Sequence, residues 1–161
     1  MSQTPWRDAA ELRADPRLAE LVEQAVAVRA RAWAPYSGFR VGAALRGESG
    51  RVYLGVNVEN ASYGVAICAE RTAVVSAVAQ GERRFVDIAI VTDADTPAAP
   101  CGICRQMLAE FALAEPGQDL AITLVSLNGQ VTQLPLSALL PLAFTPRSFQ
   151  VKPEVAVRPD K

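Results

Sequence analysis

Histidine is absent from this chain of 161 residues, and cysteine occurs only three times. The three cysteines are Cys68, Cys101 and Cys104. An odd number of thiols argues against a disulfide framework, and a reducing compartment would keep them as thiols in any case. Because the chain has no fourth cysteine and no histidine, it cannot supply the four cysteine or histidine ligands of a closed structural metal site.

Excess charge and long apolar runs are also missing. The formal net charge is −1, so there is no global basic field that would hold a long nucleic acid. No apolar run approaches the roughly 20 residues that a membrane-spanning helix needs, and residues 1–18 lack the charged-then-apolar pattern of a secretory signal. We therefore expect a cytoplasmic protein without nucleic-acid or membrane partners.

The composition that remains is typical of one globular domain. Half of the residues are apolar and a fifth are charged, and a chain of this length can build its own core. The sequence shows no internal repeat, linker or low-complexity tract. We expect a single domain over residues 1–161, with an N-terminal extension over 1–14 and a C-terminal tail over 147–161.

Apolar periodicity and turn residues predict helices that alternate with strands. Asp15 and Pro16 form a helix N-terminus, and Asn128-Gly129 is a hairpin turn signal. Residues 57–67 show no clear period and are predicted to be a loop. The order predicts a layered α/β domain with a mixed sheet. Predicted helices cover 16–34, 69–80, 102–114 and about 137–140, predicted strands cover 39–45, 52–57, 85–91, 120–127 and 131–134, and Thr4-Pro5-Trp6 can start an additional short helix.

The cysteines lie where loops turn into helices, in the motifs Cys68-Ala-Glu70 and Pro100-Cys-Gly-Ile-Cys104. Cys101 and Cys104 share a helix face, whereas Cys68 and Glu70 can meet at one metal only if Cys68 caps its helix. Two helix N-termini would then stabilise the thiolates. Three thiolates hold a zinc ion and leave its fourth position open, which predicts a catalytic zinc site and a zinc hydrolase.

Two charged residues follow the first cysteine closely. Glu70 is the candidate proton carrier for a zinc-bound water, although an acid in a first helical turn also suits the helix dipole without any catalysis. Three thiolates around one Zn²⁺ carry a net negative charge, which weakens the ion as a Lewis acid unless charge is drawn from the sulfurs. Arg71 is the candidate donor to a thiolate; the alternative is a solvated surface arginine.

Five segments carry a resemblance to a known family. They are Pro35-Tyr-Ser-Gly-Phe-Arg-Val-Gly-Ala-Ala44, Asn57-Val-Glu-Asn-Ala61, Ile67-Cys-Ala-Glu-Arg-Thr-Ala73, Pro100-Cys-Gly-Ile-Cys-Arg-Gln106 and Leu139-Leu-Pro-Leu-Ala-Phe144. From about residue 35 to residue 146 the chain resembles the small, homotetrameric cytidine deaminases of pyrimidine salvage. The resemblance implies a three-layer α-β-α sandwich around a mixed five-stranded sheet.

The resemblance also assigns binding residues. It implies that Asn57 and Glu59 hydrogen-bond the ribose 3′-hydroxyl, although ordinary loop capping would explain the same residues. Phe39 would line the pyrimidine pocket; the alternative is a core residue at the start of a strand. The resemblance further implies that the backbone N–H of Ala69 binds the base carbonyl and that Ala61 and Tyr63 contact the 5′-hydroxyl. It also implies that Phe144 stacks on the base bound by a neighbouring subunit.

The activity that the resemblance implies is hydrolytic deamination of cytidine and 2′-deoxycytidine to uridine and 2′-deoxyuridine, with release of ammonia. The small-molecule partner is then a nucleoside. The resemblance also implies one Zn²⁺ per subunit, with water or hydroxide as the fourth ligand, and a homotetramer whose active sites are shared between subunits. Glu70 would carry protons from that water to N3 of the pyrimidine and then to the departing amino group.

Three other functions fit part of this pattern. A deaminase of a related nucleoside such as blasticidin S would share the fold, but Asn57 and Glu59 favour a free ribose. A structural zinc module that binds protein would need a fourth ligand, and a nucleic-acid-editing deaminase would need a basic arm with interleaved aromatics. The chain departs from the family at Gly38, Arg40, Ser62 and Gly64. These departures leave the catalytic residues intact and affect the shape of the sugar pocket.

Overall fold

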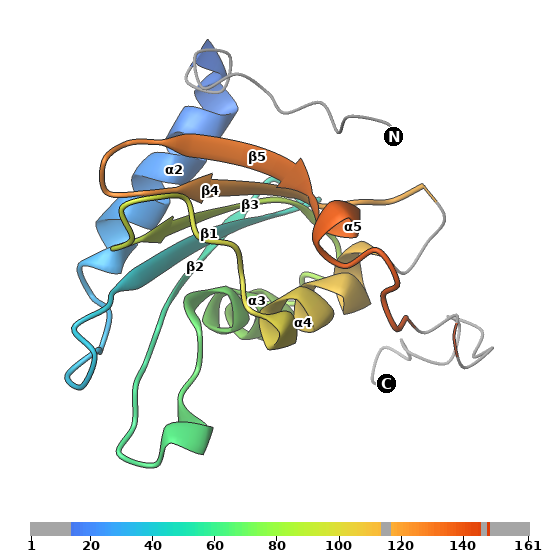
Figure 1. Ribbon diagram of the computed structural model, residues 1–161. Helices are drawn as coiled ribbons and strands as arrows, with labels where there is room; N and C mark the ends of the chain where they lie inside the picture. Colours follow the sequence, from blue (N-terminus) through green and yellow to red (C-terminus); the bar gives the residue numbers. More distant parts are fainter. Residues whose placement is uncertain (1–13, 114–116, 146–147, 149–161) are drawn as a thin grey trace.

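The computed structural model describes residues 14–113, 117–145 and 148 of the chain (Figure 1). The additional helix start at Thr4-Pro5-Trp6 lies outside these residues, as does the predicted tail over 147–161 apart from residue 148. Within the described ranges, no helix is both long enough and apolar enough to cross a membrane.

The elements follow the predicted order, with one short 3₁₀ helix added inside the loop that was predicted over 57–67. Asp15 caps the first helix as expected, because its carboxylate accepts hydrogen bonds from the N–H groups of Arg17 and Leu18. The described elements are α2 (Pro16–Arg29), β1 (Val41–Gly47), β2 (Val52–Val56), η1 (Tyr63–Val65), α3 (Ala69–Ala79), β3 (Phe85–Thr92), α4 (Gly102–Ala112), β4 (Ala121–Val125), β5 (Val131–Pro135) and α5 (Leu136–Leu139).

The first helix ends earlier than its apolar pattern predicts. The prediction of helix as far as residue 34 is wrong, since α2 ends at Arg29. The backbone of Trp33 instead pairs with the loop after β2: its N–H donates to the carbonyl of Asn57 at 3.0 Å, and its carbonyl accepts from the N–H of Glu59 at 2.8 Å. These long-range hydrogen bonds replace the helical ones, and they attach the loop after β2 to the segment that follows α2.

The five strands form one mixed sheet in the order β2-β1-β3-β4-β5. All neighbouring strands are antiparallel except β3 and β4, which are parallel. Because β2 and β3 are both antiparallel to β1, they run in the same direction. Each is followed by a helix, and both helices lie on the same face of the sheet (Figure 1). The N-termini of α3 and α4 therefore lie at the same edge of the sheet, beyond the carboxyl ends of β2 and β3 (Figure 1).

Helices cover both faces of the sheet, as the expected three-layer sandwich requires. Alternate residues of β1 point to opposite faces, so that Ala44 packs against Leu21 and Ala25 of α2. Ala43 and Leu45 belong to the larger core cluster, which contains the apolar residues of α3 and α4. In Figure 1 α2 lies on one side of the sheet and α3, α4 and α5 lie on the other.

Close contact between backbones sets the position of α3. A Cβ atom added to Gly55 of β2 would lie 2.2 Å from the carbonyl oxygen of Ala69 and 2.4 Å from the backbone nitrogen of Ala73. Only glycine allows the helix to approach the strand this closely. The contact involves the first residue of α3, so it helps to place the residues beside it, Cys68 and Glu70.

Candidate active site

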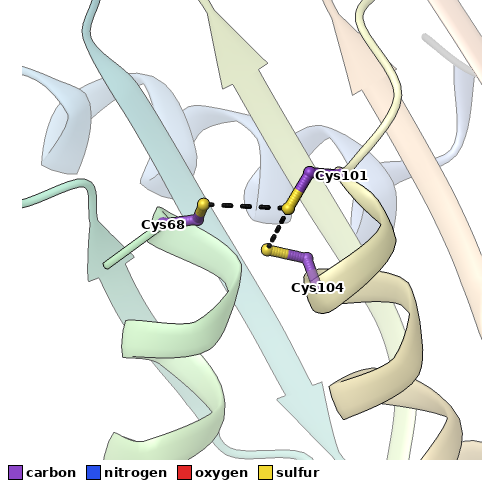
Figure 2. Close-up of side chains that lie close together, drawn as sticks. All are labelled: Cys68, Cys101 and Cys104. Carbon is purple, nitrogen blue, oxygen red and sulfur yellow. Dashed lines mark hydrogen bonds between the residues drawn. The ribbon is translucent and has the colours of Figure 1, made fainter. Parts of the chain in front are cut away.

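The three cysteines come together at the starts of the two helices (Figure 2). Cys68 is the N-cap of α3, Cys101 is the N-cap of α4, and Cys104 lies in the first turn of α4. The Sγ atoms are 4.0 Å apart for Cys68 and Cys101 and 3.5 Å apart for Cys101 and Cys104, and all three lie within 4.8 Å of one another. Tetrahedral zinc with bonds of about 2.3 Å to sulfur needs sulfurs about 3.8 Å apart, so the geometry of this cluster fits zinc.

Both capping cysteines direct their sulfurs at the cluster rather than at their own helix. Cys68 and Cys101 have extended backbone angles, and neither side chain makes a capping hydrogen bond. The first-turn N–H groups of a helix have no intrahelical acceptor, and with the helix dipole they stabilise a nearby thiolate. The two helix ends that meet here therefore bring together three sulfurs that could bind a metal ion and supply part of the positive potential that thiolates need.

The thiols of the cluster do not lose their protons equally. The hydrogen bond from Cys104, together with smaller contributions from Arg71 and Cys101, lowers the pKa of Cys68 to about 5, although burial opposes the shift. The hydrogen bond with Cys68 and burial raise the pKa of Cys104. Thiolates this close together repel one another, and a zinc ion bound to this donor set would hold the sulfurs in the deprotonated form.

Arg71 is directed at the cluster. Its Nη2 atom donates a hydrogen bond to the carbonyl of Ala66 at 2.9 Å and lies 4.0 Å from Sγ of Cys68. This position is compatible with a donor that draws charge from a thiolate.

Glu70 is the second residue of α3, and its side chain is 5% exposed. Burial raises the pKa of its carboxyl group, and the negative charge at Cys68 raises it further. Such an environment shifts the carboxyl towards the pKa range in which a group both accepts and donates a proton near neutral pH.

A cavity of about 310 Å³ opens in front of Cys68 and Glu70. Three of the predicted binding residues, Phe39, Asn57 and Glu59, form part of its wall. The rest of the wall is formed by apolar residues at strand ends and in loops, together with the buried Thr92. In the sequence these residues look like ordinary core residues, so they could not be predicted to line a cavity. The residues that complete the lining are Val41, Val58, Ala66, Ile67, Ile90, Thr92, Ala98 and Ala99.

A second cavity, of about 300 Å³, adjoins the first through Glu59 and Ala66. Tyr63 lines it and is 79% exposed. Ala61 and Phe144 line neither cavity within the described part of the chain, and the Phe144 side chain is 54% exposed while its carbonyl accepts from Nε2 of Gln106. Ala69 is buried in the core, and its backbone N–H lies in the first turn of α3 beside Cys68.

Asn57 and Glu59 hold the chain that precedes β1. Oδ1 of Asn57 accepts from the N–H of Val41 and its Nδ2 donates to the carbonyl of Phe39, both at 2.8 Å. Glu59 accepts hydrogen bonds from the backbone and hydroxyl of Ser37, and the hydroxyl bond is the main reason that its pKa is lowered. Both residues thus make the hydrogen bonds that the loop-capping interpretation predicts, and both also line the cavity.

Comparison with known proteins agrees with this site. Residues 16–115 match the family model of the cytidine and deoxycytidylate deaminase zinc-binding region. The chain is 46% identical to a cytidine deaminase of Halalkalibacterium halodurans, over 78% of this chain and 92% of that protein, and 41% identical to one of Sporosarcina psychrophila, over 78% and 90%. The crystal structure of a cytidine deaminase from Burkholderia pseudomallei has a TM-score of 0.73 and 47% identity, over 78% of this chain and 98% of that chain. The chain belongs to the cytidine and deoxycytidylate deaminase family.

Proposed function

We propose that this protein is a zinc-dependent hydrolase that converts cytidine and 2′-deoxycytidine to uridine and 2′-deoxyuridine, with release of ammonia, in pyrimidine salvage in the cytoplasm. The observation that carries the proposal is the buried carboxyl of Glu70 beside a cluster of three thiols, at one end of a cavity of about 310 Å³. Cavities of this size suit a small molecule.

One zinc ion per subunit would be held by Cys68, Cys101 and Cys104. When bound, zinc lowers the pKa of a water molecule and so supplies a nucleophile at neutral pH. Arg71 and the two helix N-termini offset the negative charge of the thiolates.

Glu70 moves the protons of the reaction. Its carboxylate takes a proton from the nucleophilic water and donates it to N3 of the pyrimidine while the water oxygen bonds to C4. It then carries the remaining proton of that hydroxyl to the amino group, and the C4–N bond breaks to release ammonia. One group performs both transfers because burial raises its pKa above that of an ordinary glutamate.

Residues of the cavity wall bind the nucleoside. Phe39 packs against the pyrimidine, and the N–H of Ala69 meets the base carbonyl. The second Nδ2 hydrogen of Asn57 and the remaining lone pairs of Glu59 bind the ribose 3′-hydroxyl, and the 5′-hydroxyl faces Tyr63 and Ala61. Among the described residues that line the two cavities none is Lys or Arg, which favours a nucleoside over deoxycytidylate, whose phosphate needs a cation.

The exposure of Phe144 supports a proposed role between subunits. Phe144 is exposed, it lines neither of the two cavities as formed by the described residues, and the neighbouring Leu142 is 97% exposed. Exposed apolar groups of this kind favour an interface. We therefore include in the proposal a homotetramer in which Phe144 completes the active site of another subunit.

The fall in near-ultraviolet absorbance on mixing purified protein with cytidine tests the function. Cytidine and 2′-deoxycytidine should both react, a chelator should abolish the reaction, and added Zn²⁺ should restore it. Deoxycytidylate and blasticidin S are the matched competing substrates. Faster turnover of either, or full activity after the protein has been freed of zinc, would overturn the proposal.

A further inference from the structure

The chain that enters β1 is held by side chains from elsewhere in the molecule. β1 begins at Val41, so Phe39 and Arg40 have no strand partners. Asn57 binds the carbonyl of Phe39 and the N–H of Val41, and the N–H of Arg40 donates to Oδ2 of Asp93 at 2.9 Å. The position of the Phe39 ring in the cavity therefore depends on Asp93 as well as on Asn57.

Asp93 joins three elements at one carboxylate. It is the first residue after β3, and its Oδ1 atom forms an ion pair with Nη1 of Arg29, the last residue of α2. The other oxygen accepts from Arg40. The side chains of Arg29 and Asp93 are only 23% and 22% exposed, and charge-assisted bonds at partly buried positions are among the stronger hydrogen bonds in proteins. The end of α2, the end of β3 and the entrance of β1 are thus tied together.

We propose that Asp93 is a positioning residue for the nucleoside: oriented by Arg29, it fixes the backbone at Arg40 and so places Phe39 against the pyrimidine. The inference rests on the proposed function. Asp93 does not itself line the cavity, but Thr92 beside it does, so Asp93 acts through its neighbours rather than by touching the substrate.

The metal cluster is held by other contacts. α3 is placed by its close approach to Gly55. The loop from Asp93 to Pro100 is fixed at its far end, where Nε of Arg105 donates to the carbonyl of Pro100 at 2.6 Å. Loss of the Asp93 carboxylate should therefore change substrate binding while the zinc site remains intact.

The variant Asp93→Asn tests this separation. It preserves size and an acceptor for Arg40 but removes the charge that pairs with Arg29. We expect the KM for cytidine to rise about tenfold, the cost of one charge-assisted hydrogen bond, with kcat within about twofold and zinc content unchanged. Asp95→Asn, an exposed residue two positions further along the same loop, is the matched control and should have no effect.

Arg29→Gln provides the second variant. It should raise KM in the same way, and the double variant should be no worse than either single one, because both remove the same interaction. Amide hydrogen exchange over residues 39–41 gives a readout that needs no activity: it should be faster in Asp93→Asn than in the wild type and unchanged in Asp95→Asn.

Two results would overturn the inference. One is an Asp93→Asn protein that is less stable but has an unchanged KM, and the other is unchanged exchange over 39–41. A wild-type protein that does not turn over cytidine would instead refute the proposed function, and the exchange measurement would still decide whether Asp93 fixes this segment.

Discussion

At the scale of single residues, Cys68 and Glu70 face the same cavity although they are only two positions apart. Side chains so spaced point away from each other inside a regular helix. They meet here because Cys68 is a cap with extended backbone, while Glu70 is already helical. The change of backbone conformation at the helix start thus places the proposed metal ligand next to the proposed proton carrier.

Arg71 is predicted to influence the reactivity of the zinc rather than the binding of zinc. Arg71→Gln removes a positive charge that lies 4.0 Å from Sγ of Cys68. We expect zinc content to stay near that of the wild type and kcat to fall about tenfold, as for other residues that orient metal ligands. Metal analysis together with steady-state kinetics checks this.

Arg31, which is exposed, provides the matched control for Arg71. Arg31→Gln should leave kcat unchanged. If Arg71→Gln behaved like Arg31→Gln, Arg71 would be an ordinary surface arginine, and some other group would have to offset the charge of the thiolates.

At the scale of elements, the site depends on how α3 lies on β2. Gly55→Ala would place a Cβ atom 2.2 Å from the carbonyl of Ala69, so the first turn of α3 has to move. We expect a loss of about 1–3 kcal/mol in the free energy of unfolding, together with weaker zinc binding because Cys68 moves with the helix. Denaturant unfolding and a zinc competition titration measure the two effects.

Gly64 in η1 is the control for the Gly55 prediction. A Cβ atom there meets nothing within 4 Å, so Gly64→Ala should change neither stability nor zinc affinity. Equal effects from the two substitutions would show that glycine flexibility, and not close packing of α3, matters in this protein.

At the scale of the whole molecule, the exposed ring of Phe144 leads to a prediction about assembly. Phe144→Ala and Glu70→Gln should each reduce activity. Co-expression of the two variants should restore part of it, because a mixed tetramer can combine an intact Glu70 from one subunit with an intact Phe144 from another. The control is the two proteins purified separately and assayed together without exchange.

Light scattering with size-exclusion chromatography should give the mass of four chains. A monomer in solution, or co-expression activity that equals the sum of the separate variants, would refute shared active sites. Neither result would affect the role of the zinc cluster within one chain.

Much of this architecture follows from local signals in the sequence. The cap at Asp15 and the hairpin turn at Asn128-Gly129 are short-range features, and the order of helices and strands is confirmed. Helix starts predicted at Cys68 and Cys101 are also confirmed, and they bring the cysteines together once β2 and β3 run in the same direction.

Contacts between residues that lie far apart in the chain could not be predicted from the sequence. The end of α2 was misplaced because Trp33 pairs with the loop at Asn57 and Glu59, which no helical period reveals. Asp93 gave no signal for the same reason: its partners, Arg29 and Arg40, lie more than fifty positions away. The two cavity glutamates also differ only in their surroundings, since burial raises the pKa of Glu70 while hydrogen bonds lower that of Glu59.

The central claim is that Glu70 moves the protons of a reaction at a three-cysteine zinc site, and Glu70→Gln tests it most directly. The side chain is buried, and glutamine keeps its size while removing its capacity to carry a proton. We predict one zinc ion per chain, as in the wild type, and a kcat for cytidine lower by at least about a hundredfold, the usual contribution of a general acid–base group. Near-normal turnover by a Glu70→Gln protein that retains its zinc would contradict the account.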